Sequence, residues 1–513
     1  MIRKLVVAIL TGLVVPALAS AELQNVHVGG QITILGEYYR NVESPGSGLR
    51  WPAALLLGRP IGTGVGAGNG IVSVFGWDDH GHGLSLVSQW TRLHVNADFT
   101  EDVRAFIELD SVDVWGEDFR SDYVTGVDNR ADSVDDVEVY QAYIEVNEVF
   151  GHPLRLRIGR QELRLGSEWL VGANDDGPSP AWGLSFDALR LTCATDLVSV
   201  DVWGAKLAER SPAEEDGDVD FYGVYGSYLG LEDITLDAYW LWLRDAGALQ
   251  DTNLGYLDEW IEDMAGVDDY DTMNLHTVGL RAAGEINAFD VEAEVAYQFG
   301  EASTTGFLFK PLLYGDDDAE YSAWGCNLEL GYTFNVDWQP RLHLGYAFFD
   351  GQDDRDITCG QWLNALFNPF YAPPASVSFN RLFSNWSHSA ILDGSEMSNA
   401  HIFHFGLEVA PTESIELAVD VGYYLADEVF DRPVLPPLGF WTRPNDAELG
   451  WEIDTNVTYN YSEDLYFCVG WDHLLVGDGL EEGDFCNSYG LDLNGGTDGD
   501  DADYFYFETG MSF

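Results

Sequence analysis

The chain has 513 residues, of which 24 are Lys or Arg and 87 are Asp or Glu, so its formal net charge is −63. This balance excludes a nucleic-acid partner, because binding a phosphate backbone requires a positive surface that releases counterions. Disorder is excluded as well, since 13% of the residues are aromatic and 46% are hydrophobic, more than a solvated polyanion carries. The chain is therefore acidic, folded and rich in aromatic side chains.

The amino terminus has the pattern of an export signal. Residues 1–21 begin with the basic pair Arg3 and Lys4, continue with an apolar run and end in Ala19-Ser20-Ala21, as a cleavable signal peptide does. A membrane anchor is the alternative, but the apolar run is shorter than the roughly 20 residues that a spanning helix needs. We expect residues 22–513 to form one exported domain.

Apolar and polar residues alternate throughout the rest of the chain. In 289–301, for example, Val291, Val295 and Phe299 fall on one face and Glu292 and Glu294 on the other, which predicts a strand between two unlike media. We count about eighteen such segments, with bounds uncertain by about two to four residues. They lie near 26–40, 85–99, 103–116, 135–147, 154–166, 184–194, 197–208, 219–229, 233–246, 274–287, 289–301, 322–335, 339–350, 401–410, 414–427, 447–461, 464–475 and 502–513.

The connections between these segments alternate in length. Tight turns such as 195–196 and 462–463 alternate with long polar loops such as 41–84 and 351–400. This predicts an all-β fold, a transmembrane antiparallel up-and-down β-barrel of about 18 strands, with short periplasmic turns and long extracellular loops. We therefore expect the protein in the outer membrane of a Gram-negative-type bacterium, with outer-membrane lipid as a partner.

The last segment ends in the terminal residue, Phe513. A carboxy-terminal strand of this kind resembles the signal that the barrel-assembly machinery recognises. An ordinary amphipathic edge strand is the alternative.

Four stretches resemble the alginate-export family of outer-membrane porins. They are LRLRIGRQELRLGSEWLVG at 154–172, GLSFDALRL at 183–191, LGYAFFDGQDDRD at 344–356 leading into ALFNPFY, and ELGWEIDTNVTYNYSEDLYFCVGWDHLLVGDG at 448–479. The resemblance implies an eighteen-stranded barrel. It also implies passive passage of an anionic polysaccharide, or another anionic solute, through an arginine-lined lumen.

Charged residues in mid-strand positions are expected to face the lumen, because facing lipid costs a few kcal/mol. Arginine suits carboxylate solutes, since its planar group can donate two hydrogen bonds at once. The alternative for each arginine is that it pairs with a lumen acid and holds the wall together. The candidates for the solute path are Arg92, His94, Arg104, Glu108, Arg157, Arg160, Arg164, Arg190, Arg281 and Arg341.

In the segment 154–166, strict alternation does not place all four arginines on the same face. Arg155 and Arg157 share one face, whereas Arg160 and Arg164 share the other. A bulge near Gly159 would bring all four inward, since bulges change the register and often contain glycine. The Gly-Arg-Gln element resembles the family motif and so makes Arg160 a lumen candidate. Asp187 and Arg190 have opposite parity, which leaves one of their two orientations open.

The inward faces also carry many acids, and these make a simple anion pore doubtful. A basic wall, from the earlier strands, would face an acidic wall from the later ones, and the transverse field suits a zwitterion or polar solute as well as a polyanion. The expected inward acids include Glu37, Asp98, Asp201, Asp237, Glu292, Glu294, Glu329, Glu408, Glu416, Asp420, Glu448, Glu452, Asp454 and Asp472.

Signals for catalysis, cofactors and metals are weak. The sequence has no nucleophile elbow, zinc-protease motif, phosphate loop or C-x-x-C, so we expect neither an enzyme nor a cofactor. His80 and His82 favour a solvated loop over a metal site. The acidic loop 492–503 leaves Ca²⁺ open, although its spacing differs from that of a calcium loop. Cys359 and Cys486 form the one disulfide that we consider, since both lie in long loops.

Two classes of function remain. The first is an outer-membrane porin for passive diffusion or export of a polar, anionic, carbohydrate-like solute, small or polymeric. The alternative is a barrel whose long loops act as a surface-exposed carbohydrate-binding protein or hydrolase. The loop 351–400 is aromatic enough for a sugar-stacking surface or for a constriction folded into the lumen. The missing catalytic motif favours the channel.

Overall fold

The computed structural model describes residues 23–43, 76–77, 83–115, 137–175, 183–209, 218–246, 272–301, 319–351, 375–393, 397–428, 432–433, 442–443, 446–481 and 501–513. The expected signal peptide, the histidine pair His80 and His82, and the cysteines Cys359 and Cys486 lie outside these residues. Only the end of the acidic loop 492–503 lies within them.

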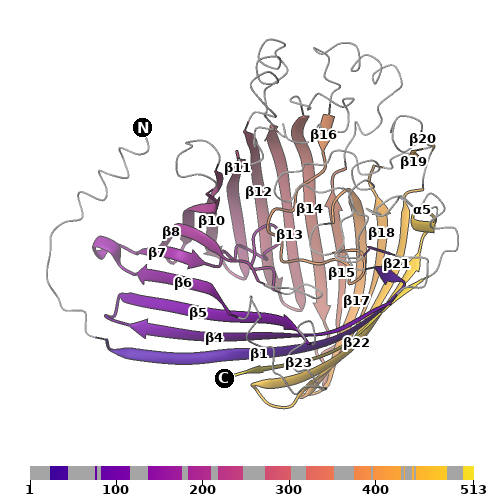
Figure 1. Ribbon diagram of the computed structural model, residues 1–513, viewed down its shortest axis with the longest axis horizontal. Coiled ribbons are helices and arrows are strands. Elements are labelled where there is room, and N and C mark those ends of the chain that lie inside the picture. The colour runs from indigo at the N-terminus through magenta and orange to yellow at the C-terminus, as the bar shows by residue number, and fades with distance from the viewer. Residues whose placement is uncertain are drawn as a thin grey trace, which may run out of the picture.

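The described strands form one closed antiparallel barrel of 18 strands, as predicted. β1 pairs with β4 on one side and with β23, the last strand, on the other, which closes the ring (Figure 1). The barrel strands are β1 (Asn25–Arg40), β4 (Gly83–Asp98), β5 (Val103–Val114), β6 (Glu138–Val146), β7 (Leu154–Gln161), β8 (Phe186–Ala194), β9 (Val198–Ala208), β10 (Val219–Leu231), β11 (Ile234–Asp245), β12 (Met273–Ile286), β13 (Phe289–Glu301), β14 (Ala319–Thr333), β15 (Arg341–Phe349), β17 (Ala400–Thr412), β18 (Ile415–Ala426), β21 (Glu448–Asn460), β22 (Leu465–Val476) and β23 (Ala502–Ser512).

Short elements accompany the barrel. β16 (Ala375–Val377) runs parallel to β14, β2 (Val42–Glu43) pairs with β3 (Gly76–Trp77), and β19 (Arg432–Pro433) pairs with β20 (Thr442–Arg443). The helical turns are η2 (Val149–Gly151) and α5 (Asp478–Glu481). Within the described ranges, none of the helices is long and apolar enough to cross a membrane.

The connections differ in length between the two ends of the barrel, as expected. On one side they are the short stretches 99–102, 147–153, 195–197, 232–233, 287–288, 334–340, 413–414 and 461–464. On the other side the connections are longer, and two of them comprise residues 41–82 and 350–399. The short side is the periplasmic side of an outer-membrane barrel.

Alternation along each strand separates a lipid-facing surface from the lumen. On β13, Val291, Val295 and Phe299 are exposed on the outside, whereas Glu294 and Gln298 are buried inside. Aromatic side chains pair across neighbouring strands on the outer face, as the rings of Tyr423 and Trp451 do at 4.3 Å. Such aromatic girdles mark the membrane interfaces of outer-membrane barrels.

A buried tyrosine pair helps to close the ring between its first and last strands. Tyr39 of β1 and Tyr504 of β23 stack with their ring centroids 4.2 Å apart. Both hydroxyls donate to the same oxygen of Glu37, Tyr39 at 3.1 Å and Tyr504 at 2.9 Å. These contacts join residues from opposite ends of the sequence, so they can form only after the whole chain has been made.

We predict that Tyr504→Leu lowers the free energy of unfolding by about 1–3 kcal/mol, because buried Glu37 loses the hydrogen bond from the Tyr504 hydroxyl. Phe505→Leu is the matched control, since Phe505 is the neighbouring aromatic residue and faces lipid. Urea titration of the refolded barrel in lipid vesicles measures both changes. Equal effects of the two substitutions would contradict the role of the buried pair.

Candidate functional site

Two segments outside the strands fold into the barrel interior, and we call them the inner segments. The first follows β7 and comprises 162–175; the second precedes β17 and comprises 378–393 with 397–399. They pair with each other, since Phe383 N donates to Leu170 O at 2.9 Å and Gly172 N donates to Phe383 O at 2.8 Å. The part of loop 351–400 that forms the second inner segment thus lies inside the lumen.

The inner segments span the interior from one wall to another. The ring of Phe383 contacts Phe186 of β8 and Phe221 of β10, with centroids 5.1 and 4.9 Å away. The ring of Trp169 stacks on those of Phe349, on β15, and Phe379, with centroids 5.9 and 5.8 Å away. The two segments therefore narrow the channel between these strands.

A buried ion pair holds the second inner segment in shape. Arg381 Nη1 lies 2.8 Å from Asp393 Oδ2, and the two side chains are only 2% and 0% exposed. Asp393 also accepts from the backbone amides of His388 at 2.7 Å and Met397 at 2.9 Å. Removing one partner of such a pair leaves an uncompensated buried charge.

Further polar contacts fasten this segment to the wall. The carboxylate of Glu452, on β21, accepts from the hydroxyl of Ser389 and from the amide of Ala390, the latter at 2.9 Å. Tyr424 of β18 donates its hydroxyl to the carbonyl of His388 at 2.6 Å. The lumen acids on these strands thus also act as anchors.

Arg92 and Arg164 hold the first inner segment. The Arg92 guanidinium lies over the rings of Trp90 and Tyr140, at 3.7 and 4.3 Å, and 3.8 Å from Asp175. Arg164 lies beyond the end of β7 and binds Asp175 at 2.5 Å. It also contacts two more acids of the same segment, Glu162 at 2.9 Å and Glu168 at 3.1 Å.

Four further arginines lie along the inner faces of β5, β7 and β8, and we call Arg104, Arg155, Arg157 and Arg190 the arginine row. Arg104 and Arg157 both bind Glu145, at 2.9 and 2.7 Å. Arg190 binds Asp201 at 2.8 Å, whereas Arg155 donates to Thr192 at 3.4 Å.

An aromatic stack continues from the arginine row. The Arg157 guanidinium lies 4.3 Å from the ring of Tyr143, which stacks on Phe106 at 5.2 Å. Phe106 in turn stacks on His94 at 5.6 Å. Glu108 accepts a hydrogen bond from Gln141 at 2.8 Å.

Arg160 projects from the outer side of β7 by strand parity, contrary to the expected inward position, and it lines a pocket of about 790 Å³ with Asp187 and Tyr140. β7 and β8 pair without a register shift, so Arg160 is opposite Asp187. The neighbouring outward residues Ile158 and Leu189 are 49% and 51% exposed. Gly159 has a φ of 128°, but no bulge there turns the chain. The arginine row therefore includes Arg155 and Arg157 and excludes Arg160.

The same register shows which way Asp187 and Arg190 point in the motif at 183–191. Asp187 faces outward and accepts two hydrogen bonds from Arg160, at 2.9 and 3.0 Å. Arg190 faces inward. The two family-like motifs thus meet in an exposed ion pair on the barrel surface.

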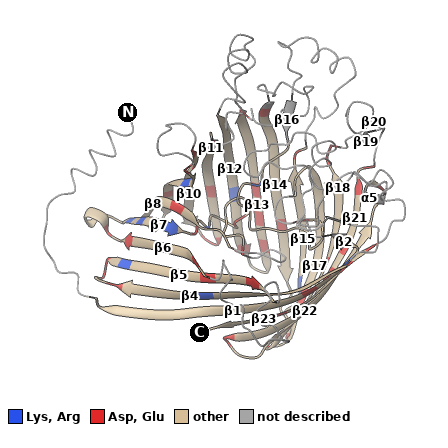
Figure 2. Ribbon diagram, viewed as in Figure 1, with Lys and Arg blue, Asp and Glu red and all other residues tan. Residues whose placement is uncertain are grey.

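Arg281 and Arg341 are surrounded by acids of the opposite wall. Arg281 binds Asp237 at 2.8 Å and Glu292 at 2.9 Å. Arg341 binds Asp290 at 2.6 Å and Glu408 at 3.0 Å. Figure 2 shows basic positions on β4, β5 and β7 and acidic positions on β13 and β14.

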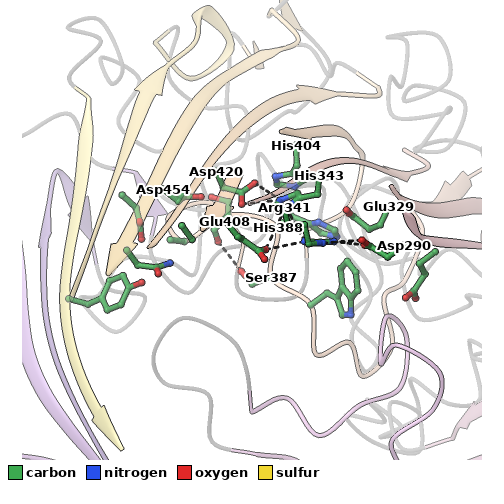
Figure 3. A pocket seen from close by; sticks show the side chains of 18 of the residues that line it. Asp290, Glu329, Arg341, His343, Ser387, His388, His404, Glu408, Asp420 and Asp454 are labelled. Atoms are coloured by element: carbon green, nitrogen blue, oxygen red, sulfur yellow. Dashed lines mark hydrogen bonds and ion pairs between the residues drawn. The ribbon is translucent and has the colours of Figure 1, made fainter. Parts of the chain in front are cut away.

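A cavity of about 860 Å³ lies between the second inner segment and the inner faces of the strands from β12 to β23. Figure 3 shows Asp420 and Asp454 towards one end of it, and Asp290 and Glu329 at the other. Its carboxylates are Glu285, Asp290, Glu292, Glu329, Glu408, Asp420, Asp454, Asp472 and Glu508.

The described residues include neither a cluster of potential metal ligands nor a disulfide. No three His, Cys, Asp or Glu side chains in those ranges gather as a metal site would require. The described cysteines, Cys193, Cys326 and Cys468, are free thiols.

Asp393→Ala should increase the single-channel conductance, because about 3–5 kcal/mol is lost when a buried pair loses one partner, enough to release the second inner segment from the lumen. Asp187→Ala, which breaks an exposed pair worth about 1 kcal/mol or less, serves as the control. Planar-bilayer recordings measure both variants. An unchanged conductance in Asp393→Ala would show that the pair does not hold the constriction.

Comparisons with known proteins agree with this architecture. The family model described as "Alginate export" matches residues 78–487. No curated protein matches the sequence significantly. Among solved structures, Acinetobacter baumannii OccAB1 superposes with a TM-score of 0.51 at 11% identity, covering 95% of this chain and 96% of that one.

Two Pseudomonas aeruginosa structures are also similar. OccK8 (OprE) has a TM-score of 0.47 at 12% identity, covering 95% of this chain and 98% of its own. OprD has a TM-score of 0.45 at 11% identity, covering 94% and 95%. Because the family model spans most of the sequence and the strands close into a barrel, the chain belongs to the alginate-export family and is a channel of the bacterial outer membrane.

Proposed function

We propose that this channel passes a polar, carbohydrate-like solute with carboxylate groups, by passive diffusion or export, and that the arginine row is its path. The observation that carries the proposal is the sharing of one acid by two arginines. Glu145 meets both Arg104 and Arg157, so cationic charge exceeds anionic charge around that carboxylate. Of the pair, Arg104 is the more accessible, with 36% of its side chain exposed.

The chemistry of the row matches that of a sugar acid. Guanidinium groups bind carboxylates through two parallel hydrogen bonds, and the ring edges of Phe106 and Tyr143 add apolar surface beside them. His94, Phe106, Tyr143 and Arg157 form one continuous stack. The row therefore offers charged and apolar contacts side by side.

The remaining arginines of the predicted path are proposed as wall and anchor residues. Arg92, Arg164, Arg281 and Arg341 each bind acids, and Arg160 lies outside. The acidic cavity opposite the row produces a field across the lumen. Such a field favours small cations and orients a polar solute that carries charge.

Channel activity is favoured over the surface-binding or hydrolase alternative by the family and by the barrel. We also propose the barrel-assembly machinery as a partner. Phe513 directly follows β23, its side chain is exposed, and its amide bonds to Gly30 O at 3.0 Å. It is therefore accessible at the periplasmic end of the closing strand.

The double variant Arg104→Gln/Arg155→Gln is expected to lower the permeability for glucuronate relative to glucose by about tenfold, since one charge-assisted hydrogen bond contributes about 1.5–3 kcal/mol. Proteoliposome swelling in the two solutes gives the ratio.

Arg40→Gln is the control for that experiment, because Arg40 shares the outward parity of Tyr38 on β1 and 63% of its side chain is exposed. It should leave the ratio unchanged. A ratio that stays at the wild-type value in the double variant would refute the arginine row as the path, and wild-type vesicles that admit neither solute would refute the channel proposal.

A further inference from the structure

The acidic cavity contains a row of aligned carboxylates. Asp420, Asp454 and Asp472 lie directly opposite one another on the neighbouring strands β18, β21 and β22, and all three line the cavity. Like charges directly opposite each other destabilise a sheet. The barrel therefore carries an unfavourable arrangement that a bound positive charge would relieve.

The protein itself supplies little positive charge to this cavity. Arg341 is the only Lys or Arg among the described residues that line it, and Asp290 and Glu408 occupy its guanidinium. His343, which also lines the cavity, binds Asp420 at 3.1 Å. Glu329, Asp454 and Asp472 form no ion pair with a Lys, Arg or His of the described ranges. The carboxyl oxygens of these three residues are therefore not held by a cation of the described chain and can accept hydrogen bonds from a bound solute.

Buried acceptors without partners line the same space. His388 is only 6% exposed, it lines the cavity, and its Nε2 has no hydrogen-bond partner in the described part of the chain. Asp454 Oδ1 is likewise buried without a partner there. Burial, together with the Arg381 guanidinium and the His404 ring, lowers the pKa of His388 well below its ordinary value. The neutral ring can thus accept a hydrogen bond.

The volume and the lining of the cavity favour an organic cation over a metal ion. No three potential ligands in the described ranges gather as a metal ion needs, whereas the volume of about 860 Å³ falls in the range of small-molecule sites. Trp386, Tyr504 and Tyr506 line it with aromatic surface. The Trp386 indole is held in place by a hydrogen bond from Nε1 to Ser167 O at 2.6 Å.

From these observations we infer that the cavity is a binding site for the ammonium group of a polar, ring-shaped solute such as an amino sugar. An ammonium has three donors and no acceptor, which matches a lining of carboxylates and an unpartnered imidazole nitrogen. The aromatic side chains contact the ring. The inference deepens the proposed function, on which it rests for the route of entry, by adding a positive charge to the class of solute.

Equilibrium dialysis of the detergent-solubilised wild-type protein tests the inference without any variant. Glucosamine and glucose are compared at near-neutral pH, because they differ at one position, where the ammonium group takes the place of a hydroxyl of similar size. Glucosamine is expected to bind about tenfold more tightly or better, the ratio that about 1.4 kcal/mol provides. Equal binding of the two sugars, or no binding of glucosamine, overturns the inference.

A charge-matched pair of variants locates the site. Glu329→Gln/Asp454→Asn/Asp472→Asn removes three cavity carboxylates and should weaken glucosamine binding about tenfold or more. The control removes three carboxylates from exposed periplasmic turns, Glu101→Gln/Glu232→Gln/Glu413→Gln, and should bind as the wild type does. Retained affinity in the cavity variant, verified as folded by its heat-modifiable gel mobility, overturns the site.

The outcome of this binding experiment is independent of the outcome of the permeability experiment that tests the proposed function. Dialysis requires no transport, so it reports on the cavity even if the barrel conducts nothing. Conversely, loss of glucosamine binding in the cavity variant should leave the permeability for glucuronate relative to glucose dependent on Arg104 and Arg155. Failure of the ammonium site with an intact glucuronate preference therefore removes only this inference.

Discussion

The requirement that every backbone polar group be paired within the membrane governs this structure. A sheet in lipid cannot leave an edge unpaired, so the first and last strands must meet, and an even number of strands lets them meet antiparallel. The stack of Tyr39 on Tyr504, with both hydroxyls on Glu37, is the inner lining of that junction. Closure then gives each strand a face in lipid and a face in the lumen.

Closure also sorts the charge of the chain. With one face of every strand in lipid, charged side chains within the membrane must point inward, and the lumen becomes crowded with them. The protein resolves this crowding by pairing, as Arg281 and Arg341 show on the acidic wall. It also uses lumen acids such as Glu452 to hold the inner segments.

The ratio of basic to acidic side chains differs between the two sides of the lumen. Around Glu145 two arginines share one acid, whereas across β18, β21 and β22 three aspartates face one another. In the proposed function, a solute between them meets arginines on one side and carboxyl groups on the other. The net charge of −63 therefore describes the chain as a whole and says little about what the channel binds, because local imbalances decide recognition.

The sequence by itself determined the number of strands, their order and the sorting of each strand into two faces, because these follow from a period of two residues that is local. Residue parity was also enough to assign Arg92, Arg104 and Arg281 to the face opposite the aliphatic residues. The tertiary structure decided what depends on partners distant in the chain. Arg160 points outward because the strand register aligns it with Asp187. Arg164 leaves the wall because β7 ends at Gln161, and Phe383 meets Leu170 through contacts between long connections. Alternation carries no information about register between strands or about where a loop packs, so the inner segments and the cavity beneath them emerge only once the barrel is closed.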